Sequence, residues 1–162
     1  MASRIRKPPE PWIAAAADPA LVARLEPLVP HARMVQTTLE SLLATTTRLG
    51  PRVVLCVPTD PEAGLQALTR LKAARSGERV LFVTPAEAAS ERLAALELGV
   101  DDALASPVND AELAGRLSLL LRRAGPVRVS RLPVGDGLEL DLDRRALLHG
   151  DEWVHLRPKE AG

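Results

Sequence analysis

The sequence has few aromatic residues and a single cysteine. Its aromatic side chains are Trp12, Phe82 and Trp153, and tyrosine is absent, so a base-stacking platform for single-stranded nucleic acid is not expected. A lone cysteine, Cys56, excludes an internal disulfide, which is typical of a protein in a reducing compartment. The sequence also has no long apolar run and no N-terminal secretion signal. We therefore expect a cytoplasmic protein without a membrane partner.

The sequence has no excess charge of either sign. Lys+Arg and Asp+Glu each number 21 in 162 residues, so the formal net charge is zero. This balance provides no general attraction to nucleic acid or to a membrane surface. A content of 46% hydrophobic and 26% charged residues is typical of a soluble globular protein, and the length suits one domain of ordinary size with a small appendage.

Short apolar runs alternate with helical patterns between residues 12 and 124. Such alternation predicts an α/β fold, in which a five-stranded parallel sheet is covered by helices on both faces. The basic, proline-rich residues 1–11 before it predict a flexible tail. The predicted strands are Trp12–Ala17, Ala32–Gln36, Arg52–Val57, Arg79–Thr84 and Ala103–Ala105.

Capping residues mark where several helices begin. Asp18 and Asp60 each precede a proline, which is the arrangement of an N-cap carboxylate followed by proline at the first helical position. Asn109 and Glu112 have capping-box spacing. Leucines recur at helical spacing after them, and the segment ends in two arginines near the negative end of its dipole. The pattern predicts a helix over about 109–123.

The character of the sequence changes after residue 124. Residues 125–134 predict a linker, because they contain glycine, prolines and no clear period. Leu138–Asp143 then alternates apolar with charged residues, and two further short apolar segments follow across turn residues. Period-two alternation interrupted by turns predicts a small antiparallel β meander over 135–162.

Two segments resemble response regulators of the OmpR/PhoB type. Gly99–Leu113 (GVDDALASPVNDAEL) is similar to the end of the receiver domain of that family, and Leu156–Glu160 (LRPKE) is similar to the start of the first helix of its winged-helix effector domain. The resemblance implies a flavodoxin-like (CheY-like) receiver over 12–124. It also implies that residues 135–162 are the N-terminal meander of a truncated winged-helix DNA-binding domain. The expected role is then two-component control of transcription.

The same resemblance implies that the phosphorylation pocket is degenerate. Family receivers bind Mg²⁺ with an acidic pair and the phosphoacceptor aspartate, and they use a lysine and a switch hydroxyl. Methyl groups cannot ligate Mg²⁺ and a thiol does so poorly, so we expect a pseudo-receiver that is not an enzyme, with no catalytic residue, metal site or cofactor. The matching positions are Ala16 and Ala17 for the pair, beside Asp18, Cys56 or Val57 for the phosphoacceptor, Thr84 for the hydroxyl and Ser106 for the lysine.

Other interpretations of these residues remain open. The emptied pocket could serve small-molecule or redox sensing through Cys56, although a cysteine in an apolar strand is more often a small buried hydrophobe. Asp18 and Asp60 with Glu62 could gather a metal, but capping already explains both aspartates. Thr84 could keep a switching role, or could be a strand-end hydroxyl or helix cap.

Histidines and arginines elsewhere have simpler explanations than a binding site. The histidines have no metal-ligand spacing, so solvated side chains are expected at His31, His149 and His155. Phosphate contacts are conceivable for four arginines, but a helix end and a linker predict the same residues, which are Arg122, Arg123, Arg128 and Arg131.

The resemblance also implies a homodimer, formed through the fourth helix, fifth strand and fifth helix. Charged residues occupy the matching positions, although an ordinary solvated surface would look the same. Specific DNA binding would require the full-length form, because a winged helix reads DNA with a recognition helix. The predicted interface residues are Glu91, Arg92, Asp101, Asp102, Glu112, Arg116 and Arg122.

Overall fold

The computed structural model describes residues 11–74, 77–124, 131–141, 146–149 and 152–155. The chain divides into two compact units at about residue 126, and each is described by itself. All but the last residue of the predicted 1–11 tail lies outside the described residues, as does the LRPKE segment at 156–160. No helix among the described residues is long and apolar enough to cross a bilayer.

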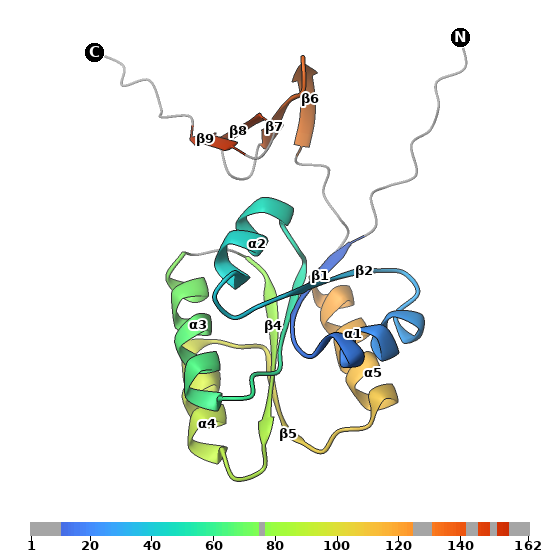
Figure 1. The fold of residues 1–162 in the computed structure, drawn as a ribbon, viewed down its shortest axis with the longest axis vertical. Coiled ribbons are helices and arrows are strands. Elements are labelled where there is room, and N and C mark those ends of the chain that lie inside the picture. Colours follow the sequence, from blue (N-terminus) through green and yellow to red (C-terminus); the bar gives the residue numbers. More distant parts are fainter. Residues whose placement is uncertain (1–10, 75–76, 125–130, 142–145, 150–151, 156–162) are drawn as a thin grey trace. The chain divides into compact units, whose positions relative to one another are not determined.

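The first unit is built on a parallel sheet, as the alternating pattern predicts (Figure 1). Among the described residues the sheet has five strands in the order β2-β1-β3-β4-β5. Each predicted strand is present, with boundaries that differ by no more than one residue. The strands are β1 (Trp12–Ala16), β2 (Arg33–Thr37), β3 (Val53–Cys56), β4 (Arg79–Pro85) and β5 (Asp102–Ser106).

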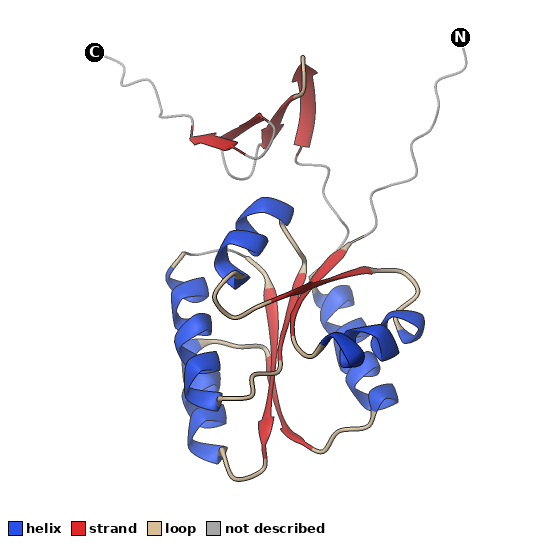
Figure 2. Ribbon diagram, in the orientation of Figure 1, coloured by secondary structure: helices blue, strands red, loops and turns tan. Residues whose placement is uncertain are grey.

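Helices cover both faces of this sheet (Figure 2). One face packs against α1 and α5 around a core that contains Ile13, Leu55 and Leu117. The opposite face packs against α2, α3 and α4 around Val54, Leu68 and other buried residues. This arrangement confirms the predicted doubly covered α/β fold. The helices are α1 (Pro19–Leu25), the 3₁₀ turn η1 (Glu26–Leu28), α2 (Leu42–Leu49), α3 (Pro61–Ala73), α4 (Ala89–Leu98) and α5 (Asp110–Arg123).

The predicted helix caps are present. The side chains of Asp18 and Asp60 each accept a hydrogen bond from a backbone N–H two residues later, at 2.8 and 3.1 Å. Asn109 accepts from the backbone N–H of Glu112 at 2.7 Å. These bonds satisfy donors that the first helical turn leaves without intrahelical partners. The three strand-to-helix turns that they close all lie at the carboxyl edge of the sheet.

The second unit is an antiparallel sheet in the order β6-β7-β8-β9. It confirms a meander but corrects the predicted linker, because β6 begins at Arg131 within 125–134. Asp136 and Gly137 join β6 to β7 with φ angles of 46° and 77°, the conformation that an Asp-Gly hairpin turn requires. The strands are β6 (Arg131–Gly135), β7 (Leu138–Asp141), β8 (Ala146–His149) and β9 (Glu152–His155).

Candidate functional site

The structure brings the predicted pocket positions together at the carboxyl edge of the parallel sheet. Ala16 at the end of β1 lies beside Cys56 at the end of β3. Thr84, near the end of β4, is paired in register with Ala105, and Ser106 at the end of β5 is paired with Pro85. Four strands therefore deliver these residues to one edge, where ligands of open parallel sheets bind.

The centre of this edge is apolar and closed to water. Ala16 and Cys56 are buried in the same core cluster, with Cys56 at 0% exposure. Val57, the other candidate for the phosphoacceptor position, is partly buried against the cluster on the opposite face. Burial raises the pKa of the Cys56 thiol to about 12. The reactive form of cysteine is the thiolate, so this side chain behaves as a small hydrophobe and a redox role is not favoured.

The carboxylates closest in sequence to the pocket act as helix caps. Asp18 is exposed and caps α1, and Asp60 is exposed and caps α3. Ala17 and Ser106 are half-buried and provide no carboxylate or ammonium group. Within the described ranges, no three His, Cys, Asp or Glu side chains lie close enough together to hold a metal ion.

Thr84 is held by an arginine from the following helix. Its hydroxyl is buried at 1% exposure and accepts a hydrogen bond from Nη1 of Arg92 at 2.9 Å. The interpretation of Thr84 as a helix cap is wrong, because α4 begins after Ala88, which has no capping side chain. No local sequence pattern indicates the contact with Arg92, which the family resemblance predicts only as an interface residue.

Several predicted interface residues form ion pairs within one subunit. Arg116 of α5 lies 3.2 Å from a carboxylate oxygen of Asp102 and 3.8 Å from one of Glu112. Glu91 accepts from the hydroxyl of Ser90 at 2.9 Å, and Arg122 is exposed. These groups lie on α4, β5 and α5, as predicted. The contacts all lie within one chain.

Asp101 has a structural role at the opposite edge of the sheet. Its carboxylate lies 3.0 Å from Nη1 of Arg79 and accepts from the backbone N–H of Val80 at 2.7 Å. The backbone N–H of Asp101 donates to the carbonyl of Val80 at 3.0 Å. Asp101 therefore fastens the entry of β5 to the start of β4. Sequence spacing could not reveal this contact, because its partners lie more than twenty positions away.

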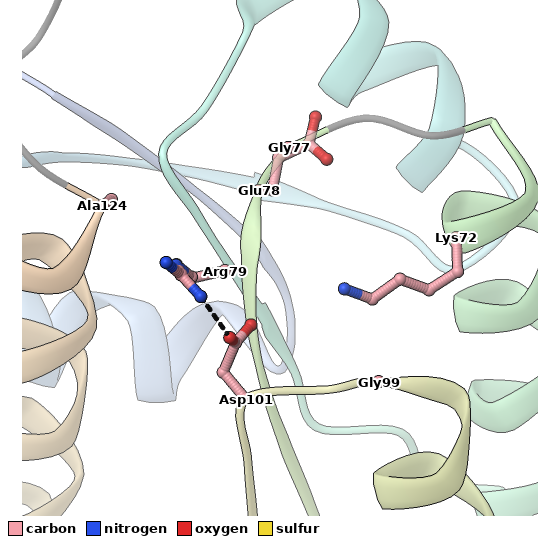
Figure 3. Close-up of a pocket in the computed structure, with 7 residues that line it drawn as sticks. All are labelled: Lys72, Gly77, Glu78, Arg79, Gly99, Asp101 and Ala124. Carbon is pink, nitrogen blue, oxygen red and sulfur yellow. Dashed lines mark hydrogen bonds and ion pairs between the residues drawn. The ribbon is translucent and has the colours of Figure 1, made fainter.

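A polar cavity of about 310 Å³ lies at this amino edge of the sheet. Figure 3 shows the Arg79–Asp101 pair among the residues that line it, with the side chain of Lys72 extending toward the pair. No pattern in the sequence indicates a cavity here. It is far from the apolar carboxyl edge, and its lining is mostly polar and charged. The lining residues are Lys72, Gly77, Glu78, Arg79, Gly99, Asp101 and Ala124.

The two histidines whose side chains are described are exposed. His31 follows η1 and His149 ends β8, and both are solvent-facing, as predicted. The side chains of His155 and Arg131 lie outside the described residues, as does Arg128. Arg122 and Arg123 are exposed in the last turn of α5, where cations favour the helix dipole.

Comparison with known proteins gives two kinds of match. No family model matches the chain. Among curated proteins, the transcriptional regulatory protein BasR of Escherichia coli is 36% identical over 108 residues, which is 67% of this chain and 48% of BasR. The probable transcriptional regulatory protein TcrX of Mycobacterium tuberculosis is 36% identical over 124 residues, 74% of this chain and 53% of TcrX. The chain thus spans about half the length of the curated relatives it matches.

Solved structures match the first unit. The orphan response regulator HP1043 of H. pylori superposes with a TM-score of 0.63 at 20% identity, covering 72% of this chain and all of that one. The receiver domain of the response regulator TorR superposes with a TM-score of 0.60 at 26% identity, covering 70% of this chain and 98% of that one. These similarities confirm the CheY-like fold.

Proposed function

We propose that this chain is a phosphorylation-independent regulatory and dimerisation module of a two-component transcriptional regulator. Its similarity to the transcriptional regulatory proteins BasR and TcrX, and its likeness in fold to the receiver domain of TorR, support the proposal. The proposed module is a pseudo-receiver and not an enzyme. Any DNA-binding output is proposed by analogy with these relatives, which are named as transcriptional regulatory proteins. One observation carries the proposal, namely the buried, uncharged carboxyl edge at Ala16 and Cys56.

The chemistry of phosphoryl transfer supports phosphorylation independence. A transferring phosphoryl group develops negative charge that Mg²⁺ and nearby cations must stabilise. Mg²⁺ needs hard oxygen ligands in near-octahedral geometry. At this edge the ends of β1 and β3 present a methyl group and a neutral thiol, and Asp18 is already bonded to the backbone of α1. The edge therefore provides neither the metal ligands nor the nucleophile for the family reaction.

Exposed apolar side chains support the dimerisation part of the proposal. Leu93 and Leu96 on α4 are 59% and 48% exposed, and they lie one helical turn apart on the same surface. Asp102, Glu112 and Arg116 place charges of both signs on β5 and α5. In a dimer with a two-fold axis, these apolar and charged side chains would face the same set of side chains on the second copy. Apolar contact would provide affinity, and the charges would set the register.

Phosphorylation is tested by intact mass. The protein is incubated with acetyl phosphate and Mg²⁺ beside a receiver domain that retains the acidic pair and the aspartate. We expect the control to gain one phosphoryl group and this chain to gain none. A phosphoryl adduct that is labile to hydroxylamine, as an acyl phosphate is, would refute phosphorylation independence.

Dimerisation is tested by light scattering on charge-introducing variants. We expect the wild-type chain to be a dimer, and Leu93→Glu and Leu96→Glu to be monomers, because a buried unpaired carboxylate opposes association. Leu28→Glu is the matched control, since Leu28 is 45% exposed on η1, away from this surface. A monomeric wild type, or equal association of all three variants, would remove the dimer from the proposal.

A further inference from the structure

One arginine ties the β4–α4 loop to helix α4. Nη1 of Arg92 donates to Oγ1 of Thr84 at 2.9 Å and to the carbonyl of Pro85 at 2.6 Å, and Nη2 donates to the carbonyl of Ala86 at 3.0 Å. The three acceptors are consecutive residues at the end of β4. A single guanidinium from the first turn of α4 therefore binds all three residues through which β4 leads into the following loop.

The local geometry makes this contact the main side-chain link between the loop and the helix. The helix has no side-chain cap at Ala88, so its start is not fixed by the device that fixes α1, α3 and α5. The planar, permanently charged guanidinium presents several donors in a rigid fork. Hydrogen bonds from a charged donor are stronger than neutral ones. Arg92 thus supplies, from inside the helix, the anchoring that its N-terminus lacks.

Arg92 is hydrogen-bonded to the hydroxyl of Thr84, at the position that matches the switch hydroxyl of family receivers. Thr84 is the position matched to the switch hydroxyl, and its oxygen is buried and already bonded to Arg92. Leu93 follows Arg92 directly and is exposed together with Leu96. Because a helix is rigid over one turn, fixing Arg92 also fixes the direction of the apolar surface formed by these two leucines.

We propose that Arg92 is an internal lock that holds the β4–α4 loop and helix α4 in one position without a phosphoryl group. The proposal deepens the proposed function, and it rests on that function for the statement that no phosphoryl group reaches Thr84. The lock leaves the surface of α4 permanently presented. Because the donors of Arg92 are bonded within its own chain, Arg92 is not proposed to form an ion pair across the dimer interface.

Hydrogen–deuterium exchange of the full chain tests the lock. The backbone N–H groups of Ala88 and Arg92 donate within the loop and the first turn of α4, so their exchange reports local opening. We expect Arg92→Gln to raise exchange across 86–93 by at least tenfold. Arg70→Gln is the matched control, because Arg70 is exposed on α3, and its exchange over 86–93 should equal that of the wild type.

Two further variants distinguish loss of this local contact from general unfolding of the protein. Thr84→Val removes one of the three acceptors and keeps the shape, and Arg92→Lys keeps the charge but cannot span three oxygens. Both should raise exchange over 86–93 by less than Arg92→Gln does, with no change in the core of β1 and β3. Unchanged exchange over 86–93 in Arg92→Gln and Thr84→Val would overturn the lock. A phosphoryl adduct in the wild type would instead refute the proposed function and leave these exchange rates as they are.

Discussion

The two edges of the parallel sheet differ in where they place buried apolar and charged side chains. The carboxyl edge, where relatives are expected to be acidic, is formed by buried Ala16 and Cys56. The amino edge has an ion pair, Arg79 with Asp101, beside a polar cavity. Strand order and helix capping do not depend on these residues, so the topology of the sheet is compatible with apolar or charged side chains at either edge.

The largest expected effect comes from restoring a carboxylate at the carboxyl edge. Cys56→Asp places an unpaired charge at a position with 0% exposure, and we expect it to lower the free energy of unfolding by about 3–5 kcal/mol. Ala105→Asp is the control, since Ala105 is exposed at the same edge and should change stability by no more than about 0.5 kcal/mol. Urea denaturation measures both. Equal stability of the two variants would show that the carboxyl edge is open to water.

Alkaline pH tests the same burial without adding a charge. The Cys56 thiol has a pKa raised from 9.0 to about 12 by burial, so its stabilising contribution is complete below pH 9. As the pH rises from 9 to 12 the unfolded thiol ionises and the folded thiol does not, and stability falls by about 1.4 kcal/mol per pH unit.

The Cys56→Ala variant isolates this contribution to the pH dependence. The protein has no tyrosine, so the other side chains that titrate in this range are mainly lysines, which both proteins share. We expect the unfolding free energy of the variant to decline less steeply above pH 9 than that of the wild type. Parallel declines would mean that the thiol ionises equally in the folded and unfolded states.

Much of the fold could be predicted because its signals are local. The N-caps at Asp18, Asp60 and Asn109 each depend on residues two or three positions away, and all three form as expected. The start of β6 was missed although Asp136-Gly137 is a hairpin signal, because the prolines and glycine before it favoured a linker.

The site could be predicted only in part, because its decisive contacts join distant residues. The family resemblance implied that Ala16, Cys56 and Thr84 lie in one pocket, and all three lie at the carboxyl edge of the sheet. Sequence spacing could not show that Arg92 turns back onto β4, nor that Asp101 pairs with Arg79. Those contacts depend on side-chain direction and on strands brought together by the fold, and a local pattern specifies neither.

Removing the ion pair at the amino edge should lower the free energy of unfolding less than Cys56→Asp does. Asp101→Ala leaves the buried N–H of Val80 without its side-chain acceptor and removes the partner of Arg79, which should cost about 1–3 kcal/mol. The control is Asp110→Ala, because the Asp110–Arg24 pair is similarly short at 2.9 Å but more exposed, and such pairs contribute about 0–1 kcal/mol. Thermal denaturation compares them. Equal losses of stability in the two variants would show that the Asp101–Arg79 pair contributes no more than an ordinary surface ion pair.

The smallest expected effects come from alanine substitutions at two helical glycines. The two substitutions should change the free energy of unfolding in opposite directions. A Cβ at Gly64 of α3 would lie 2.4 Å from Cγ of Pro58 and 3.2 Å from Phe82, where α3 packs closely on the carboxyl edge. Overpacking exceeds the gain in helix propensity, so Gly64→Ala should cost about 1 kcal/mol net. A Cβ at Gly115 of α5 meets nothing within 4 Å, and Gly115→Ala should stabilise by about 0.5–1 kcal/mol.

Chemical denaturation of both glycine variants decides how tightly the carboxyl edge is packed. The two substitutions add the same methyl group to a helix, so their difference reports the contacts with Phe82 and with Pro58, the residue that follows β3 by two positions. If Gly64→Ala also stabilised the protein, the loop after β3 would have room to move aside. The carboxyl edge could then open, and its buried thiol would be accessible to a ligand after all, whereas opposite signs would show an edge that is closed by packing.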